Sequence, residues 1–311
     1  MSVRRFTALG TASQVPTSQR NQHSSFLKWD EQGFLFDPGE GTQRQMIHAN
    51  ISASEITAIF ITHFHGDHCL GLAGIFQRLS LDTVKHAVDI YFPAGGAEFL
   101  HNIKRASSYY QTASFNFHAI TADTVFETDG NLVIHAQRLV HPVETFGYRI
   151  EEKNTVNLIS EELDNIGLSG PKVGVLKETG EITYRGQTVH LSDVSHPRKG
   201  QVFAFIMDTG ICEAAFRLAK DADLVVMEST FLKKDAEIAA QYGHLTSLQA
   251  GEIARKAGVQ TLLLTHFSQR YGADGDFAGE ASTVHGDVIQ LNDGDVYHLR
   301  RQKKSNLGLN D

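Results

Sequence analysis

The sequence predicts an α/β fold from two patterns that follow one another along the chain. Short apolar runs rich in β-branched residues, such as 56–62, have the composition of strands that are buried on both faces. Downstream of this run, Leu72, Ile75, Phe76 and Leu79 follow the i, i+3, i+4, i+7 spacing of a helix. A turn between such a strand and a helix lies at the carboxyl end of the strand, where open α/β sheets place their ligands.

The first such turn carries a candidate metal site. Residues 63–68 contain His63, His65, Asp67 and His68, and imidazole nitrogens with carboxylate oxygens are the ligand set of hydrolytic zinc. The alternative is a chance cluster of surface histidines. We disfavour it because the cluster sits between a predicted buried strand and a predicted amphipathic helix.

Three further candidate ligands occupy similar positions later in the chain. His141, Asp208 and His266 each come just after a short apolar run. If these runs are neighbouring strands, their ends converge on one edge and bring the three side chains to the first four. Seven ligands are too many for one tetrahedral ion and suit a pair of ions.

Composition predicts a large single-domain enzyme of a reducing compartment. The chain has 311 residues, of which 41% are hydrophobic, and two cysteines, which are too few for a disulfide framework. We find no leader-like segment and no apolar run of membrane length, so we expect a cytoplasmic protein that does not bind membranes. The formal charge of −8 argues against a protein that coats nucleic acid nonspecifically.

One segment departs from this acidic background. The segment 166–200 contains five basic residues, among them Lys172 and Lys177, and only three acidic ones. Its frequent glycines and few long apolar periods favour a projecting arm, with a hairpin at 181–189, over an ordinary solvated loop. The basic run at 300–304 is predicted to be a solvated tail.

These motifs together resemble a known group. The chain is similar to the metallo-β-lactamase superfamily, whose His-x-His-x-Asp-His motif is followed by a later His, Asp and His. Within it the chain most resembles the ribonuclease Z family, from Gly10 to about Tyr271. The pieces that carry the likeness are 15–21, 36–43, His141 with 147–150, 208–210, 243–246 and 266–271.

The resemblance implies a fold and an activity. The expected fold is a four-layer αββα sandwich forming one domain over 1–311, with an inserted arm at about 155–197 that acts as an exosite for transfer RNA. The expected protein is a homodimer. Its implied activity is that of a zinc-dependent endoribonuclease, which removes 3′ trailers from transfer-RNA precursors by attack of a metal-held hydroxide on a phosphodiester.

It also implies roles for individual residues. One ion would take His63, His65 and His141, the other Asp67, His68 and His266, and Asp208 would bridge two Zn²⁺ ions, or Mn²⁺ in their place. Asp67 would also accept a proton. Residues implied to contact substrate are Arg20, Asn21, Thr209, Thr246, Ser268 and Arg270, together with Lys172 and Lys177 of the arm.

Proton delivery is expected from His244, which lies in a polar loop that opens a helix. Glu228, directly after an apolar run, matches the acid that orients this histidine in the family, and a carboxylate neighbour raises the pKa of an imidazole. The alternative for Glu228 is a cap at the edge of the core.

Two other functions are weighed. A small-molecule or cyclic-nucleotide phosphodiesterase of the same superfamily would keep the metal site but need no basic arm. A nonenzymatic metal-binding or RNA-binding protein is disfavoured because all seven ligands and the His244/Glu228 pair are present.

Overall fold

The computed structural model describes residues 3–128, 131–272 and 275–299, and the chain divides into two compact units. The first is formed by the described residues of 1–127, 134–150 and 202–311, and the second by those of 128–133 and 151–201. The basic run predicted to be a solvated tail, 300–304, lies outside the described residues.

The first unit begins with a mixed sheet of seven strands within the described residues, in the order β18-β1-β2-β3-β4-β5-β6. β1, β2 and β3 pair antiparallel, whereas β3 through β6 pair parallel. The strands are β1 Arg4–Gly10, β2 Ser24–Trp29, β3 Gln32–Phe36, β4 Ala58–Phe60, β5 Val88–Pro93, β6 Phe115–Ile120 and β18 Val296–His298.

A second sheet, also of seven strands within the described residues, has the order β17-β16-β15-β14-β9-β8-β7. β14, β15 and β16 are buried along their whole lengths, which is why they read as continuous apolar runs. The strands are β7 Thr124–Glu127, β8 Leu132–Arg138, β9 Phe146–Glu152, β14 Val202–Ile206, β15 Leu224–Glu228, β16 Thr261–Thr265 and β17 Val288–Gln290.

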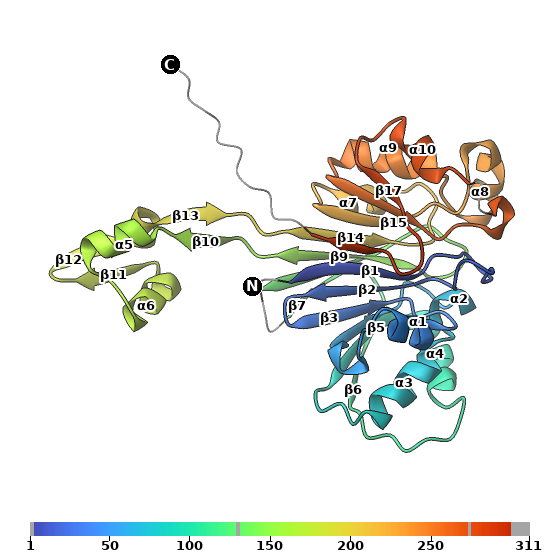
Figure 1. Cartoon of the computed structure of the whole chain (residues 1–311), viewed down its shortest axis with the longest axis horizontal. Coiled ribbons are helices and arrows are strands. Elements are labelled where there is room, and N and C mark those ends of the chain that lie inside the picture. Colours follow the sequence, from blue (N-terminus) through green and yellow to red (C-terminus); the bar gives the residue numbers. More distant parts are fainter. Residues whose placement is uncertain (1–2, 129–130, 273–274, 300–311) are drawn as a thin grey trace. The chain divides into compact units, whose positions relative to one another are not determined.

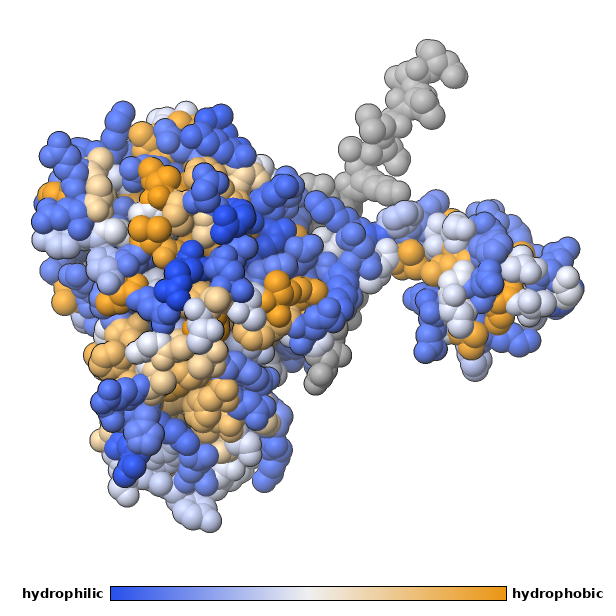
Figure 2. Space-filling view, turned by 180° about the vertical axis from the view of Figure 1, so that it is seen from behind, coloured by the Kyte–Doolittle hydropathy of each residue, from blue (hydrophilic) through white to orange (hydrophobic). Residues whose placement is uncertain are grey.

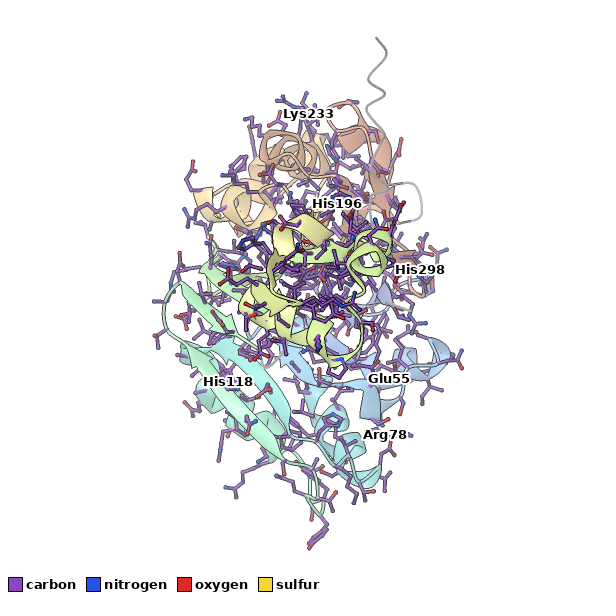
Figure 3. The ribbon with its side chains drawn as sticks, turned by 90° about the vertical axis from the view of Figure 1, so that its left-hand side faces the viewer. Glu55, Arg78, His118, His196, Lys233 and His298 are labelled. Carbon is purple, nitrogen blue, oxygen red and sulfur yellow. The ribbon has the colours of Figure 1, made fainter. Side chains whose placement is uncertain are left out.

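Helices cover the outer face of each sheet (Figure 1). In Figure 3, Arg78 of α3 and Lys233 of η4 appear on opposite sides of the view. On the first sheet lie α1 Thr42–His48, η1 Ala53–Glu55, α2 Gly66–Cys69, α3 Leu72–Leu81, η2 Ala94–Gly96 and α4 Ala97–Lys104. On the second lie α7 Glu213–Ala219, η4 Lys233–Asp235, α8 Ala236–Tyr242, α9 Ser247–Ala257, η5 Gln269–Tyr271 and α10 Phe277–Ser282. The predicted four-layer αββα sandwich is confirmed.

Aromatic side chains join the inner faces of the two sheets. The ring of Phe36, at the end of β3, stacks on Phe205 of β14 with centroids 4.5 Å apart and on Phe60 of β4 at 5.0 Å. Phe203 packs on Phe6 at 6.1 Å, again from one sheet to the other. Because Phe36, Phe60 and Phe205 lie near the carboxyl ends of β3, β4 and β14, they hold together the strand ends that carry the candidate ligands.

The second unit has a small apolar core of its own. Leu168, Leu176 and Val194 are buried in it, and Figure 2 shows apolar patches between hydrophilic side chains on this segment, at the right of that view. The predicted hairpin is confirmed as β11 paired with β12. The elements are β10 Thr155–Leu158, α5 Ser160–Ile166, α6 Pro171–Thr179, β11 Glu181–Tyr184, β12 Gln187–His190, η3 Leu191–Val194 and β13 Ser195–Arg198.

Some predicted strand boundaries were wrong. The run 56–62 yields only the three-residue β4, because Ile56 caps η1 and the chain leaves the sheet after Phe60 to form the site. The short run before His141 is not a strand, since β8 ends at Arg138. No helix among the described residues is long and apolar enough to cross a membrane.

The contact between the sheets makes a stability prediction. Replacing Phe203 with Ala should lower the free energy of unfolding by about 3–5 kcal/mol, because it leaves a cavity between two sheets that cannot collapse fully. Chemical denaturation would measure this. Phe117→Ala, on a side chain that is 43% exposed, is the matched control, and equal losses in both variants would contradict the role assigned to the inter-sheet rings.

Candidate metal centre

A buried carboxylate supports the turn that carries the histidine cluster. Asp37 follows β3, and its Oδ1 accepts the backbone N–H of Thr62 at 2.7 Å while its Oδ2 accepts the Thr62 hydroxyl at 2.7 Å. The same Oδ2 lies 2.9 Å from Nδ1 of His68. Asp37 therefore ties the ends of β3 and β4 together and sets the ring of a candidate ligand.

One group of donor atoms is formed by His63, His65, His141 and Asp208, whose ligand atoms all lie within 4.8 Å of one another. Nε2 of His63 is 3.0 Å from Nδ1 of His65 and 3.4 Å from Oδ2 of Asp208. Nε2 of His141 lies 3.4 Å from the same nitrogen of His65. These residues come from loops after β4, β8 and β14, so both sheets contribute.

A second group is formed by Asp67, His68 and His266. Nε2 of His68 lies 3.1 Å from Nε2 of His266, and Oδ2 of Asp67 lies 3.3 Å from that His266 nitrogen. Oδ2 of Asp208 is 3.5 Å from Nε2 of His68. One oxygen of Asp208 therefore faces both groups.

The outer ring nitrogens are already engaged in hydrogen bonds. Nδ1 of His141 donates to the Gly243 carbonyl at 2.9 Å. The Thr62 hydroxyl gives its proton to Asp37, so its oxygen accepts from Nδ1 of His63 at 3.0 Å. These contacts leave the Nε2 lone pairs of His63 and His141 free to face the centre, as the outer hydrogen bonds of metal-binding histidines do.

The backbone at this centre is strained. Asp37, Asp208 and His266 have positive φ values of 42°, 45° and 63°, a region that residues other than glycine seldom occupy. Such conformations persist where the surroundings overdetermine them, and they gather at functional sites. The strain directs Asp208 and His266 inward from the ends of β14 and β16.

The charges at the centre suit a divalent cation. Burial raises the pKa of the Asp208 carboxyl, but the histidines His266, His68 and His63 outweigh it and hold that pKa well below its usual range. Burial lowers the pKa of His63 well below its ordinary value. Oδ1 of Asp208 is buried and has no hydrogen-bond partner among the described residues. Burial also lowers the pKa of His68, but the carboxylates of Asp208, Asp67 and Asp37 outweigh it and raise that pKa well above its ordinary value. Carboxylates with imidazoles that give up their protons on binding are the donor set that binds such ions.

Next to the centre, Glu228 and His244 form a buried pair. Oε1 of Glu228, the last residue of β15, lies 3.0 Å from Nδ1 of His244. Burial lowers the pKa of His244, but the carboxylates of Glu228 and then Asp208 outweigh it and raise that pKa to about 9. His244 is thus a protonated imidazole at neutral pH whose Nε2–H is the available donor.

Two hollows open at this pair. One of about 560 Å³ is lined by the candidate ligands His65, Asp67, His141 and Asp208. The other, of about 620 Å³, lies beside Phe231, Ser268 and Arg270. His244, Gln14 and Tyr242 line both, so the hollows meet at the imidazole.

Comparison with known proteins identifies the family. A family model described as Anti-Pycsar protein Apyc1 matches residues 4–160 and so ends before Asp208, Glu228 and His244. Ribonuclease Z of Salinispora arenicola (strain CNS-205) is 48% identical over 281 residues, covering 90% of this chain and 91% of that protein. Ribonuclease Z of Nocardia farcinica (strain IFM 10152) is 48% identical over 295 residues, with 94% and 97% covered. The chain belongs to the ribonuclease Z family.

The solved structure of human tRNase Z, short form, agrees with this assignment. It is 25% identical and superposes with a TM-score of 0.71 over 96% of this chain and all of that one. The predicted metallo-β-lactamase fold and the predicted enzyme class, a metal-dependent endoribonuclease, are confirmed. As a member of the ribonuclease Z family the chain is a hydrolase, and its histidine and aspartate groups indicate a divalent metal site.

The residues of this ribonuclease Z family member that are predicted to contact substrate differ in their surroundings: some line a hollow and others are buried. Ser268 and Arg270 line the larger hollow. Thr209 and Thr246 are buried: the backbone N–H of Thr209 donates to Oε1 of Glu228 at 2.8 Å, and Thr246 caps the start of α9. The structure thus places these two threonines as supports of the His244 loop and its partner, and their substrate contacts stay predictions.

Arg20 and Asn21 hold neighbouring segments together. The guanidinium of Arg20 donates to the Thr11 hydroxyl at 2.6 Å and to the Leu291 carbonyl at 2.8 Å. Nδ2 of Asn21 donates to the Glu40 carbonyl at 2.7 Å. Their substrate contacts also stay predictions.

Lys172 and Lys177 lie on α6 of the second unit, exposed to solvent, and Nζ of Lys172 sits 4.6 Å from the ring centre of Tyr184. The basic balance counted over 166–200 does not extend to the whole arm. Acidic residues outnumber basic ones over 155–197, because Glu161, Glu162 and Asp164 lie in α5. The cations are therefore local to α6 and the hairpin.

Sequence reasoning missed Thr230. Its hydroxyl donates to Oε2 of Glu228 at 2.6 Å, and its oxygen lies 2.9 Å from Nδ1 of His266 and 3.3 Å from Nδ1 of His244. One hydroxyl therefore joins a candidate ligand to the acid pair. The available signal was the polar run Glu228-Ser229-Thr230 directly after a buried strand.

The Glu228 contact makes a prediction about protonation. In metal-free protein, NMR titration should place the His244 midpoint near pH 9, and Glu228→Gln should bring it down toward the ordinary 6.5. Because the folded-state pKa is raised, the pair stabilises the fold fully below about pH 6.5 and this stability is lost as pH rises through about 9. Asp89→Asn, which alters the exposed His118 pair, should leave the midpoint unchanged. A midpoint unaffected by Glu228→Gln would contradict the assignment.

Proposed function

We propose that this chain is a zinc-dependent endoribonuclease that removes 3′ trailers from transfer-RNA precursors. The observation that carries the proposal is that one oxygen of Asp208, Oδ2, faces both donor groups. Next to it lies His244, which the buried carboxylate of Glu228 holds in place. The family membership supports an RNA substrate, and the name of the human relative, tRNase Z, supports transfer RNA.

The donor groups suit two ions. His63, His65 and His141 would hold one, Asp67, His68 and His266 the other, and Asp208 would be shared. Imidazole and carboxylate donors favour Zn²⁺, with Mn²⁺ as the alternative. When bound, a pair of divalent ions lowers the pKa of water and neutralises charge on phosphoryl oxygens.

The chain's own residues move the protons. Water forms a new bond to phosphorus as the bond from phosphorus to the 3′ oxygen breaks, and the proton that water loses passes to the Asp67 carboxylate. His244 gives its Nε2 proton to the departing 3′ oxygen, because Glu228 occupies its Nδ1. The products are a 3′-hydroxyl on the transfer RNA and a 5′-phosphate on the trailer.

The second unit would bind the transfer-RNA body. Its own apolar core lets it fold as a separate module, and Lys172 and Lys177 expose charges on one short helix. Lysines neutralise phosphates without reading sequence, which suits an enzyme that acts on many transfer RNAs. The proposal includes a homodimer, which the family resemblance implies, and a cytoplasmic location, which the content of only two cysteines favours.

Separating metal binding from proton delivery tests this mechanism. His244→Ala should lower kcat by about 10²–10⁴-fold, the usual contribution of a general acid, with two ions per chain retained. Asp67→Ala should lose both activity and an ion, because it removes a ligand. Metal analysis and single-turnover cleavage of a 3′-extended precursor measure the two effects. Wild-type cleavage by His244→Ala, or one ion per wild-type chain under saturating zinc, would contradict the mechanism.

Replacing 160–194 with a short Gly/Ser linker tests the second unit. This change removes the module but keeps the β10–β13 ladder. KM for precursor should rise steeply, and hydrolysis of a small chromogenic phosphodiester should stay within a few fold of wild type, because that substrate cannot use remote binding energy. The salt dependence of RNA binding should also become shallower.

Two outcomes of that replacement would count against the exosite. Equal losses on both substrates would mean that the second unit supports the fold or the dimer. Unchanged precursor cleavage would favour a small phosphodiester as the substrate.

A further inference from the structure

None of the seven candidate ligands lines the larger hollow. Its volume of about 620 Å³ falls within the range of pockets that enclose small ligands, about 300–1,000 Å³. It meets the ligand-lined hollow at His244. A chain molecule that crosses His244 would therefore occupy both hollows, one segment in each.

The lining of the larger hollow combines apolar surface with a cation. Ile238 and Tyr242 are four residues apart on α8, so they share one face of that helix. Tyr242 is 54% exposed, so its ring is accessible to a ligand in this hollow. Arg270 also lines this hollow, with its guanidinium carbon 6.0 Å from the ring centre of Phe231.

Arg270 is only loosely held. Its Nη1 lies 3.8 Å from Oδ1 of Asp235, and its side chain is half exposed. A guanidinium tethered at one side over an aromatic ring can contact a phosphate or stack on a base. Aromatic walls with a cation are the features with which proteins hold single-stranded nucleotides.

The position of His244, in the lining of both hollows, decides which nucleotide belongs in which hollow. A general acid must lie next to the departing oxygen, and in this reaction that oxygen is the 3′ oxygen of the upstream nucleotide. In the proposed reaction the phosphorus and the attacking water would lie among the candidate ligands, which line the other hollow. From the scissile phosphate, the upstream nucleotide therefore extends past His244 and away from the ligand-lined hollow.

We infer that the hollow lined by Phe231, Tyr242 and Arg270 binds the upstream nucleotide, which becomes the new 3′ end, while the trailer leaves through the ligand-lined hollow. This inference rests on the proposed function and deepens it. Every base has a face that can stack on tyrosine, so this hollow accepts any base. An enzyme that processes transfer RNAs with different terminal bases needs such tolerance.

The test pairs two protein variants with two altered substrates. Tyr242→Ala removes the exposed wall, and Phe231→Leu removes the inner ring but keeps an apolar filling. Each is assayed on a precursor that lacks the base upstream of the cut and on one that lacks the base downstream. Leu70→Ala, in the ligand-lined hollow, serves as the opposite-side variant. Tyr110→Ala, on a side chain 88% exposed elsewhere, is the matched control.

On intact precursor, Tyr242→Ala should lower kcat/KM by about 5- to 150-fold, the usual effect of losing one stacked base. On the substrate without the upstream base, Tyr242→Ala and Phe231→Leu should cleave within about twofold of wild type, because the lost contact no longer exists. The effect of Leu70→Ala on kcat/KM should disappear only on the substrate that lacks the downstream base. Tyr110→Ala should match wild type on all three substrates.

Because Tyr242 lines both hollows, the result for Phe231 decides. A loss in Phe231→Leu that disappears when the downstream base is missing, or that depends on neither base, would overturn the assignment. Failure of the wild-type protein to cleave any precursor would instead contradict the proposed function. Circular dichroism and metal content of each variant identify a folding defect. If Phe231→Leu proves misfolded, Ile238→Ala decides the outcome, because Ile238 lines the larger hollow and not the ligand-lined one.

Discussion

The centre depends on one carboxylate held where two groups of histidines meet. Oδ2 of Asp208 is 3.4 Å from Nε2 of His63 and 3.5 Å from Nε2 of His68, in a position only 2% exposed. A charge buried so completely is expensive unless it is compensated. The imidazoles supply part of that compensation and a divalent cation supplies more. Asp208 therefore requires that both sheets present their strand ends at the same place.

The rest of the first unit meets that requirement. Stacked Phe36 and Phe205 bring β3 against β14, which places Asp37 and its partners beneath Asp208. Parallel pairing of β14, β15 and β16 then aligns the ends that carry Asp208, Glu228 and His266. Thr230 connects the last two through one hydroxyl. The packing of apolar rings thus determines distances between polar atoms that never touch those rings.

Much of this could be predicted from the sequence, and the reasons for the remainder are physical. Buried parallel strands leave continuous apolar runs, so 202–206 and 261–265 were recognisable, and the polar residue after each run marked the sheet edge. His141 follows a loop rather than a strand, because hydrogen bonding in the sheet ends at Arg138. The occupied guanidinium of Arg20 was not predictable, since its partners Thr11 and Leu291 are far apart in sequence.

The left-handed backbone at Asp208 and His266 has a consequence for anyone who would transplant this centre. Copying the seven side chains onto another αββα scaffold would not reproduce it, because an ordinary strand end aims its last side chain elsewhere. The recipient loops must first accept a conformation that costs of order 1–3 kcal/mol at each such residue. A graft would therefore need the hydrogen-bonded turns beneath the ligands as well as the ligands themselves.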